Sequence, residues 1–463
     1  MAEHLRYVST RGRSPAQGIE DVLIAGLAPD GGLFLPQAWP QLTRAEIASF
    51  RGQPYVQVAR QILGRLLGEL GEDVLDYEVP RAYGEFAGQD VAPLREIGDG
   101  RFLLELFHGP TLAFKDIALQ LLGGLLDRAL CRRGQRATVL AATSGDTGSA
   151  AIAALGGRQG IELFVIHPLG RVSEVQRRQM TTSRHANVHN IALRGSFDDA
   201  QAIVKALFAD REFATAQNLT AVNSINFVRI AAQAVYYFTA TAALGVAPTF
   251  VVPTGNFGDV FAGEAAMRMG LPVERLIVAT NANDILARTL ATGTYRVGSV
   301  QPTLSPSMDI QVASNFERAL YEALARDGDA CRMAMADFAQ HRSLAIAPAA
   351  LKALRARYSA VAISDAQTLA AITRHYEHSG QLVDPHTAVA LAAAEGLSRE
   401  GPLVMLATAH PAKFPDAVRA ATGQVPPLPE RLRALYEGEE RQTVLANDMD
   451  LVRNFITSRA GTK

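Results

Sequence analysis

The chain has 463 residues, of which 48% are hydrophobic and 20% are charged, a composition typical of folded proteins and not of disordered ones. This length predicts two or three domains. Lysine and arginine number 45 against 46 aspartates and glutamates, so the net charge of -1 offers no basic surplus for binding nucleic acid.

Residues 1 to about 95 are predicted to form a first unit. Turn-forming residues concentrate in APDGGLFLP (28–36), and YVQVARQILGRLL (55–67) has the spacing of apolar residues that indicates a helix. These signals predict a small N-terminal domain of mixed structure.

From about residue 100 the pattern changes to strands that alternate with helices. We expect strands at 102–106, 137–142, 163–168, 188–193, 249–253 and 275–280, and helices at 116–130, about 226–244 and 260–270, with a further helix capped by Ser196 and Asp199. This alternation predicts parallel sheets with helices on both faces. Ligands in such folds bind at the carboxyl ends of the strands. The segment 285–345 is weakly patterned, and no elements are predicted there.

The sequence also limits where the protein works. The N-terminus MAEHLRYVSTRG has charged and polar residues where a signal peptide needs an apolar core, so we expect no export. Cys131 and Cys331 are too far apart for a metal knuckle, and so low a count suits a reducing compartment. Between Arg229 and Asp259 there is no charged residue, but polar residues, glycine and proline interrupt the stretch, which favours a buried helix and strand over a membrane span. We therefore predict a cytoplasmic protein without a membrane partner.

Two glycine-rich loops have the form of anion-binding sites. ATSGDTGSAA (142–151) and PTGNFGDVFAG (253–263) each follow a predicted strand and precede a predicted helix. Glycine lets the backbone approach a ligand, and the first N–H groups of a helix favour negative charge. Neither loop is a G-x-G-x-x-G dinucleotide motif or a P-loop. The alternative is that these glycines only connect strands to helices, but two such loops in the same context favour anion binding.

A third candidate anion site lies in AVNSINFVRIAAQ (221–233). Ser224 and Arg229 are five residues apart across a predicted helix start, with Asn223 beside the serine. A guanidinium there can bind a phosphate through two parallel hydrogen bonds. The alternative is a surface arginine near a helix N-cap.

Lys115 stands out in HGPTLAFKDIAL (108–119), because Leu112, Ala113 and Phe114 precede it and a predicted helix follows. One interpretation is a lysine that reaches past its neighbours to water. The other is a reactive amine, because apolar surroundings favour the uncharged form. An amine near two anion loops suggests pyridoxal phosphate, which binds to a lysine through its aldehyde and also carries a phosphate. A third anion site suggests that the substrate carries phosphate as well.

Other histidine-containing segments give weaker signals. His185 and His189 are four residues apart but lack the glutamate of a zinc protease motif, so no metal site is predicted. DPHTA (384–388) and LATAHPAKF (406–414) carry His386, Thr408 and His410, and each segment alone reads as a helix start or a strand end.

Taken together, HGPTLAFKD, TSGDTGSA, NSINFVR and PTGNFGD resemble the threonine synthase family in its longer bacterial and fungal form, a family of fold type II pyridoxal-phosphate enzymes. YVSTRG and GLAPDGGLFLP resemble its N-terminal domain, and the likeness extends from about residue 7 to about 415. The last 50 residues carry no recognised motif. The resemblance implies an α/β fold with two doubly wound lobes after an N-terminal domain. The expected divisions are 1–95 for that domain and 96–463 for the catalytic region, with the smaller lobe at about 131–221 and the larger lobe as the remainder.

The resemblance also implies roles for individual residues. Lys115 corresponds to the Schiff-base lysine, Thr408 to the neutral partner of the pyridine nitrogen, and Asp146 stands where shorter relatives often have an asparagine that contacts the cofactor ring. The loop that holds the cofactor phosphate corresponds to Gly255, Asn256, Phe257 and Gly258. The substrate-binding positions correspond to Ser144, Thr147, Asn223, Ser224 and Arg229.

The implied reaction converts O-phospho-L-homoserine and water to L-threonine and phosphate, the last step of threonine biosynthesis, in a lyase that is a monomer or a homodimer. A related enzyme, such as a serine/threonine dehydratase or an amino-acid phospholyase, is the close alternative. The pair Ser224 and Arg229 argues against the dehydratase, which needs no second phosphate site. A non-catalytic anion-binding protein is the alternative from a different class.

Overall fold

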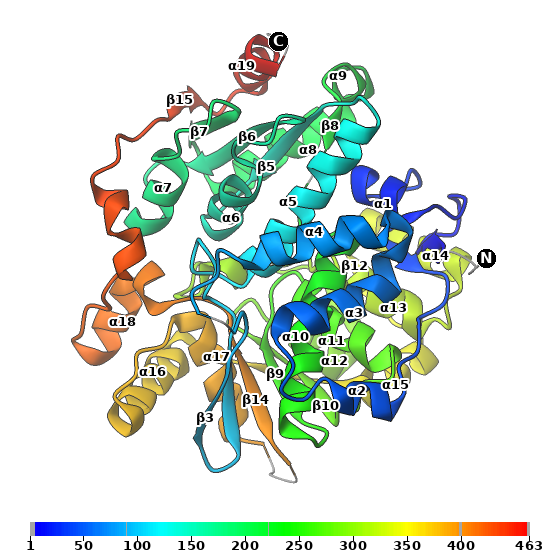
Figure 1. Ribbon diagram of the computed structural model, residues 1–463, viewed down its shortest axis with the longest axis vertical. Coiled ribbons are helices and arrows are strands. Elements are labelled where there is room, and N and C mark those ends of the chain that lie inside the picture. The colour runs from blue at the N-terminus through cyan, green and yellow to red at the C-terminus, as the bar shows by residue number, and fades with distance from the viewer. Residues whose placement is uncertain (1–4, 89, 221, 398–400, 461–463) are drawn as a thin grey trace.

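Two parallel sheets organise the chain in the computed structural model, which describes residues 5–88, 90–220, 222–397 and 401–460 (Figure 1). The larger sheet has the strand order β13-β10-β9-β14-β4-β3, and only β3 runs antiparallel to its neighbour. Its strands are β3 (Leu94–Gly98), β4 (Arg101–Glu105), β9 (Thr249–Pro253), β10 (Arg275–Thr280), β13 (Tyr358–Ala362) and β14 (Leu403–Ala407).

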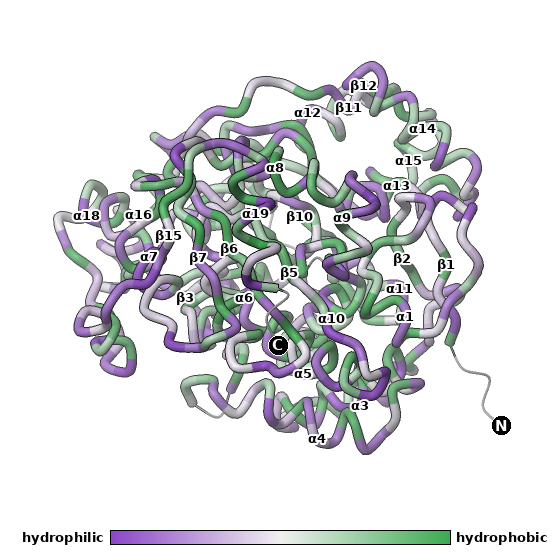
Figure 2. The backbone as a smooth tube through the Cα atoms, turned by 90° about the horizontal axis from the view of Figure 1, so that it is seen from above, coloured by the Kyte–Doolittle hydropathy of each residue, from purple (hydrophilic) through white to green (hydrophobic). Residues whose placement is uncertain are grey.

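The smaller sheet is parallel throughout, with the order β15-β7-β6-β5-β8. Its strands are β5 (Ala137–Ala142), β6 (Ile161–Pro168), β7 (Val188–Arg194), β8 (Leu219–Thr220) and β15 (Thr443–Ala446). β5 and β6 are mostly hydrophobic (Figure 2), as strands buried on both faces must be.

Helices cover both faces of each sheet, so the doubly wound prediction is confirmed. α8 (Phe197–Ala209) and α19 (Met449–Ala460) cover one face of the smaller sheet, and α6 (Asp146–Leu155) packs near the other beside α5 (Lys115–Arg132). In the larger lobe, α16 (Asp365–Ser379) and α17 (Pro385–Glu395) cover one face, while α10 (Phe227–Leu244) and α11 (Gly258–Arg268) cover the other. The remaining helices of the catalytic region are α7 (Glu174–Thr181), α9 (Arg211–Ala216), α12 (Ile285–Thr292), α13 (Phe316–Ala323), α14 (Gly328–His341), α15 (Pro348–Arg357) and α18 (Pro415–Thr422).

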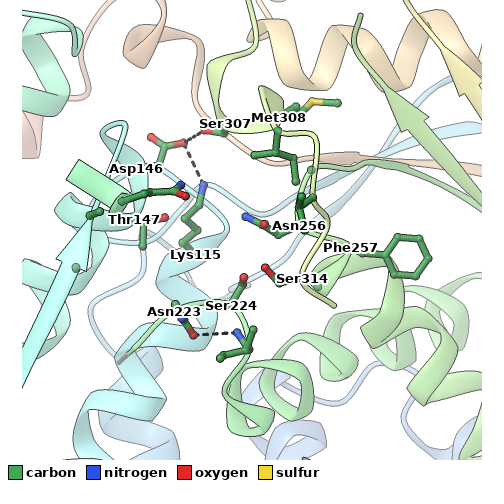
Figure 3. Close-up of a pocket in the computed structure, with 18 of the residues that line it drawn as sticks. Lys115, Asp146, Thr147, Asn223, Ser224, Asn256, Phe257, Ser307, Met308 and Ser314 are labelled. Atoms are coloured by element: carbon green, nitrogen blue, oxygen red, sulfur yellow. Dashed lines mark hydrogen bonds and ion pairs between the residues drawn. The ribbon is translucent and has the colours of Figure 1, made fainter. Parts of the chain in front are cut away.

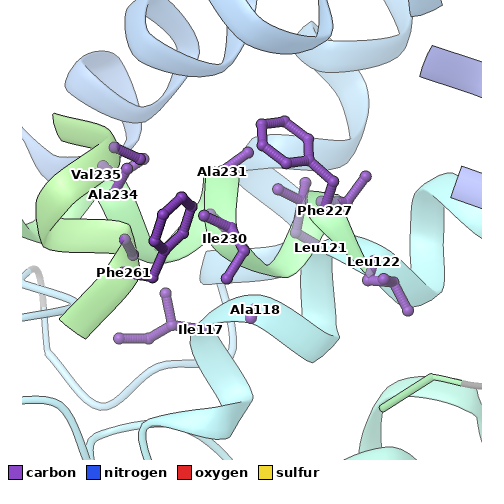
Figure 4. Packing of buried hydrophobic residues seen from close by; sticks show 14 of the residues in the cluster. Ile117, Ala118, Leu121, Leu122, Phe227, Ile230, Ala231, Ala234, Val235 and Phe261 are labelled. Carbon is purple, nitrogen blue, oxygen red and sulfur yellow. The ribbon is translucent and has the colours of Figure 1, made fainter. Parts of the chain in front are cut away.

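The N-terminal part packs against the helices that join the two lobes. It contains the antiparallel pair β1 (Tyr7–Ser9) and β2 (Phe34–Pro36) and the helices α1 (Ile19–Ala25), α2 (Arg44–Ser49), α3 (Tyr55–Leu67) and α4 (Glu72–Tyr83). α3 lies against α10 and α4 against α5. α5 and α10 in turn bury apolar side chains against each other (Figure 4), including Ile117, Leu121, Phe227 and Ile230. Burying a side chain of this size contributes about 1.5–3 kcal/mol.

The local signals in the sequence placed several elements well. Strands 137–142, 249–253 and 275–280 and helix 55–67 have the predicted bounds, and Ser196 and Asp199 form the capping box of α8. The weakly patterned segment 285–345 contains α12, α13, α14 and the short antiparallel pair β11 (Thr294–Arg296) and β12 (Ser343–Ala345).

The last 50 residues cross from the larger lobe to the smaller one. The Arg431 guanidinium donates to the carbonyl oxygens of His108 and Gly109, at 3.0 and 2.8 Å, and Glu440 forms an ion pair with Arg177 of α7 at 2.9 Å. The chain then adds β15 to the smaller sheet beside β7, and α19 packs on α8. The expectation that the remainder of 96–463 outside 131–221 forms the larger lobe therefore misplaces β15 and α19. Among the described helices, none is long and apolar enough to span a membrane.

Candidate active site

A cavity of about 1010 Å³ lies at the carboxyl ends of β5, β9 and β14. Its lining includes the loops that follow these strands, which is where parallel α/β folds bind ligands. The predicted site residues that border it are Lys115, Asp146, Thr147, Asn223, Ser224, Arg229, Gly255, Asn256, Phe257, Gly258 and Thr408. Ser144 is half-buried and outside the lining. The fold thus brings residues from five separate segments around one cavity, and several of them are labelled in Figure 3.

Lys115 is the first residue of α5 and extends into the cavity (Figure 3). Its side chain is 11% exposed, and its Nζ donates to Asp146 Oδ2 at 3.3 Å. Burial lowers the pKa of the Lys115 ammonium; the carboxylate of Asp146 opposes this, while the charges of Lys413 and Arg229 lower the pKa further. The interpretation of a lysine that reaches water is therefore wrong, and the amine is more easily deprotonated than an ordinary lysine.

Three further side chains in the described part of the chain contact the carboxylate beside Lys115. Lys413 Nζ lies 2.9 Å from Asp146 Oδ1, Gln176 Nε2 donates to the same oxygen at 2.9 Å, and Ser307 Oγ donates to Oδ2 at 3.0 Å. The Asp146 side chain is therefore fixed from both sides and accepts bonds on both oxygens.

These partners set the charge of Asp146. Burial alone would raise the pKa of this carboxyl, but the ammonium groups of Lys413 and Lys115 hold it well below its usual range. Asp146 is an anion at any physiological pH and balances the positive charge that collects in this part of the cavity.

The sequence reasoning did not single out Lys413, Ser307 or Gln176. Lys413 is fully buried, and its Nζ also donates to the Thr111 carbonyl at 2.7 Å, in the loop before Lys115. The sequence around Lys413 did indicate a buried lysine, because small and apolar residues surround it just after the end of a predicted strand. Lys115 has a similar apolar sequence context. Ser307 lies in the segment 285–345, which has no usable pattern.

The loop after β9 has the shape of an anion cradle. Phe257 has a left-handed backbone with φ of 65°, and its ring points away from the cavity to pack on Phe316 and Tyr358 (Figure 3). A Cβ on Gly255 would lie 2.9 Å from the Ser307 carbonyl oxygen, so only glycine fits there. α11 starts at Gly258 without a side-chain cap. Its first N–H groups are therefore available to an anion.

Hydrogen bonds from its own backbone hold the loop after β5 in one conformation. Thr143 Oγ1 accepts hydrogen bonds from the N–H groups of Gly145 and Gly148, at 2.9 and 2.8 Å. Gly145 has φ of 135°, and a Cβ there would meet Gln176 at 2.4 Å, so a side chain is excluded. This geometry presents Asp146 and Thr147 at the start of α6, toward the cavity.

Arg229 borders the cavity as a buried cation, and the described part of the chain provides no anionic partner for it. The residue is 3% exposed, its Nη1 donates to the Val222 carbonyl at 3.3 Å, and its Nε has no partner among the described residues. Burial lowers the pKa of this guanidinium to about 10, so it is still charged at neutral pH. A buried charge normally requires a partner, and the cavity is where that partner can bind.

Asn223 and Ser224 lie in the turn before α10. Asn223 is exposed, and its Oδ1 accepts from the Ile225 N–H at 3.2 Å, so the side chain shapes the turn. The Ser224 side chain borders the cavity between Asn223 and Ser314 (Figure 3). Both residues therefore border the same cavity as Arg229.

Thr408 and His386 also line the cavity. The Thr408 carbonyl accepts from the Phe114 N–H at 2.9 Å, which ties the end of β14 to the residue before Lys115. The Ser307 N–H donates to His386 Nε2 at 3.2 Å, so the proton of the imidazole lies on Nδ1, which bonds to Asp384 Oδ2 at 2.7 Å. His386 thus holds Ser307 in place through Nε2.

The buried amine, the uncapped helix start and the glycine cradle suit a cofactor that carries an aldehyde and a phosphate. The family model described as pyridoxal-phosphate dependent enzyme matches residues 93–361. Fold and cavity together define the class as a fold type II pyridoxal-phosphate enzyme, and pyridoxal phosphate is its cofactor. Two further models, for the N terminus and the C-terminal part of threonine synthase, match residues 6–83 and 387–456.

Full-length comparisons narrow the class to one family. Threonine synthase from Pseudomonas aeruginosa is 49% identical over 98% of both chains, and that from Saccharomyces cerevisiae is 38% identical over 97% of both. The crystal structure of pyridoxal-phosphate-bound threonine synthase from Brucella melitensis superposes with a TM-score of 0.96 at 50% identity, covering 99% of this chain and 100% of the other. Yeast threonine synthase superposes with a TM-score of 0.92 at 37% identity over 98% of both chains. The chain belongs to the threonine synthase family.

Proposed function

We propose that the cavity converts O-phospho-L-homoserine and water to L-threonine and phosphate. The observation that carries this proposal is Arg229, a buried guanidinium whose Nε has no partner among the described residues. The cradle formed by Gly255, Asn256, Phe257 and Gly258 accounts for one phosphate, that of the cofactor. A dehydratase that acts on an unphosphorylated amino acid would leave the buried charge of Arg229 unpaired, which is costly.

In this proposal Lys115 attaches the cofactor, and Thr408 faces the cofactor ring. When bound, pyridoxal phosphate supplies an electron sink that stabilises negative charge on the carbon next to the substrate nitrogen. Lys115 Nζ, once released, accepts the proton from the α carbon and returns it later. The lowered pKa of the lysine supports this role, because a base must be deprotonated near the working pH.

Asp146 and its partners orient the reactive amine. Its carboxylate accepts from Lys115 Nζ and remains ionised, so it can stabilise the ammonium that forms when Lys115 takes up a proton. Thr147 and Ser144 are proposed to contact the substrate carboxylate, through the hydroxyl of Thr147 at the cavity and the loop around Ser144.

Arg229, Ser224 and Asn223 are proposed to bind the substrate phosphate. A guanidinium that bonds to the leaving phosphate gains strength as negative charge develops on its oxygens, so the interaction favours the transition state. The site then serves both to select a phosphorylated substrate and to assist departure of phosphate.

The decisive experiment measures phosphate release from O-phospho-L-homoserine by the purified holoenzyme, beside 2-oxo acid formation from L-serine and L-threonine. Phosphate release with formation of threonine supports the proposal. Rapid 2-oxo acid formation without phosphate release would assign the protein to the dehydratases, and no reaction with either substrate would favour an anion-binding protein.

Replacing Gly258 with aspartate should weaken cofactor binding. The new carboxylate would lie at the start of α11, where a Cβ already comes within 3.2 Å of Asn315 Nδ2. Two like charges about 4 Å apart repel by about 4 kcal/mol at an effective dielectric constant of about 20, so the cofactor Kd should rise at least about 100-fold. Dialysis followed by cofactor quantification measures this. Gly258→Ala separates the effect of the Cβ from that of the charge, and equal retention in all three proteins would remove this loop from the cofactor site.

Replacing Arg229 with leucine should lower kcat/KM for O-phospho-L-homoserine by roughly 10–150-fold. A charge-assisted hydrogen bond contributes about 1.5–3 kcal/mol, and leucine fills the space without a donor. Cofactor content should stay near wild type, and so should spectroscopic binding of an unphosphorylated amino acid. Arg44→Leu, at an exposed position of α2, is the surface control. Loss of cofactor, or equal weakening of both ligands, would show that the two anion sites are wrongly divided.

A further inference from the structure

The start of α13 joins the two loops to which we assign the two phosphates. Asn315 is fully buried, and its Nδ2 donates to the Ser224 carbonyl at 3.1 Å and to the Asn256 carbonyl at 3.2 Å. Its backbone N–H donates to the same Asn256 oxygen at 3.0 Å. One amide side chain thus holds a peptide unit of the proposed substrate-phosphate loop and a peptide unit of the cofactor-phosphate loop.

Arg318 fixes the orientation of Asn315. This arginine is fully buried, and its Nη1 donates to Asn315 Oδ1, which leaves the Asn315 Nδ2 group directed at the two loops. The same guanidinium donates through Nη2 to the Ile225 carbonyl at 2.6 Å and through Nε to the Phe34 carbonyl at 3.1 Å. Because the guanidinium is planar and rigid, these three bonds fix the position of Asn315 relative to both Ile225 and β2.

The neighbours of Asn315 reinforce the same connection. Phe316 packs edge to face on Phe257, the residue of the cradle whose ring points away from the cavity. Glu317 accepts from Thr10 Oγ1 at 2.6 Å and pairs with Arg11 at 2.9 Å. Each of these side chains therefore ties the N-terminal domain or the cradle to α13.

Holding a carbonyl also sets the direction of an N–H group. In a planar trans peptide the C=O and the N–H point in opposite directions. Asn315 holds the carbonyl of Asn256, so the N–H of Phe257 in the cradle must point away from Asn315. Asn315 also holds the Ser224 carbonyl, so the N–H of Ile225 points away from Asn315 as well. Small errors in such positions are costly, because a misplacement of about 1 Å at a reacting centre lowers rates by about 100-fold.

We propose that Asn315, oriented by Arg318, is a positioning residue that sets the spacing between the cofactor phosphate and the substrate phosphate. This inference rests on the function proposed above, because it needs both anions in one cavity. It predicts that disturbing Asn315 weakens both anion sites together, whereas Arg229→Leu affects only the substrate phosphate.

The test uses Asn315→Asp, which keeps the size of the side chain and its bond to Arg318. It replaces the Nδ2 donor with an oxygen that faces two carbonyl oxygens, while the Arg318 guanidinium pairs with the new carboxylate and limits its repulsion of either phosphate. Two readouts on the holoenzyme measure the two sites: cofactor retained after dialysis against graded pyridoxal phosphate, and calorimetric titration with inorganic phosphate. Loss of two buried hydrogen bonds predicts that each dissociation constant rises about 10-fold.

Asn187→Asp is the matched control. Asn187 Nδ2 also donates to backbone carbonyls, those of Leu155, Arg158 and Ile161, but it lies in the smaller lobe outside the cavity lining. It should lower the thermal midpoint without changing either dissociation constant. Should Asn315→Asp fail to fold, Arg318→Lys keeps a cation but cannot make the three bonds at once, and both constants should then rise about threefold.

The outcomes separate this inference from the proposed function. Joint weakening of both anions in Asn315→Asp, with neither affected in Asn187→Asp, supports the positioning role. If the wild-type holoenzyme binds both anions but Asn315→Asp keeps both constants within twofold, the positioning role is wrong and the proposed function stands. If the wild-type holoenzyme binds no inorganic phosphate, the positioning role is wrong, and the proposed function is then decided by phosphate release from O-phospho-L-homoserine.

Discussion

Replacing Lys115 with alanine should lower kcat by at least about 1000-fold and abolish the visible absorbance of bound cofactor. The amine has two tasks in the proposed reaction, covalent attachment of the cofactor and transfer of the α proton. A positioned general base by itself contributes about 100–10,000-fold. Steady-state phosphate release and an absorbance spectrum before and after borohydride treatment measure the two tasks separately.

The control is Lys352→Ala, at an exposed position of α15, which should keep both activity and colour. The Lys115→Ala protein should keep the thermal stability of the apoenzyme, because the lost ammonium was paying a desolvation cost in the cavity. Turnover within about tenfold of wild type, without added amines, would contradict the assignment of Lys115 as the reactive lysine.

Replacing Lys413 with methionine should lower the free energy of unfolding by about 3 kcal/mol or more. Lys413 is fully buried, so the change removes an ammonium that bonds to the Thr111 carbonyl and pairs with Asp146. Breaking a buried pair leaves a charge without its partner, at a cost of about 3–5 kcal/mol. Lys115 remains beside Asp146 and keeps the loss near the lower bound. Urea denaturation of the apoprotein provides the measurement.

The double variant Lys413→Met with Asp146→Asn tests whether charge is the cause. It removes both members of the pair, so it should recover part of the lost stability, whereas volume loss alone would leave the double variant no better than Lys413→Met. The pH dependence gives a second check. In the wild type the pKa of Asp146 is held low, so its contribution is present above the unfolded-state pKa and is lost as pH falls through the folded one. Without Lys413 the folded pKa rises and that acid-side contribution shrinks.

Much of the site was visible in the sequence because its signals are local. In 137–151 and 249–263, a short apolar run is followed by glycines with threonine and aspartate, and then by a helical pattern. This order predicts a strand, a loop and a helix start. Parallel topology brings the ends of such strands together, so placing the loops also placed the cavity. Lys115, Gly258 and Arg229 were predictable because each lies at a helix start or in its first turn.

The partners of these residues were decided by the tertiary structure alone. Lys413 meets Asp146, and Asn315 meets both Ser224 and Asn256, across separations of many tens of residues in the chain. Nothing local distinguishes a lysine or asparagine that will be buried against a distant carboxylate or carbonyl from one that will be exposed. The charge state of Asp146 likewise depends on which cations lie near it after folding.

The amino-acid sequence by itself therefore determined the alternation of strands and helices and the loops that follow the strands. It also determined that Lys115 lies at the N-terminus of a helix. The spacing of neighbouring residues sets hydrogen bonding and burial over a few turns, and these are the interactions that a local pattern records. Only the tertiary structure decided that β15 and α19 complete the smaller lobe, that two lysines share one carboxylate, and that a single amide holds both anion loops. Those contacts join groups that are distant in sequence, and their strength depends on burial and distance, which exist only once the chain has folded.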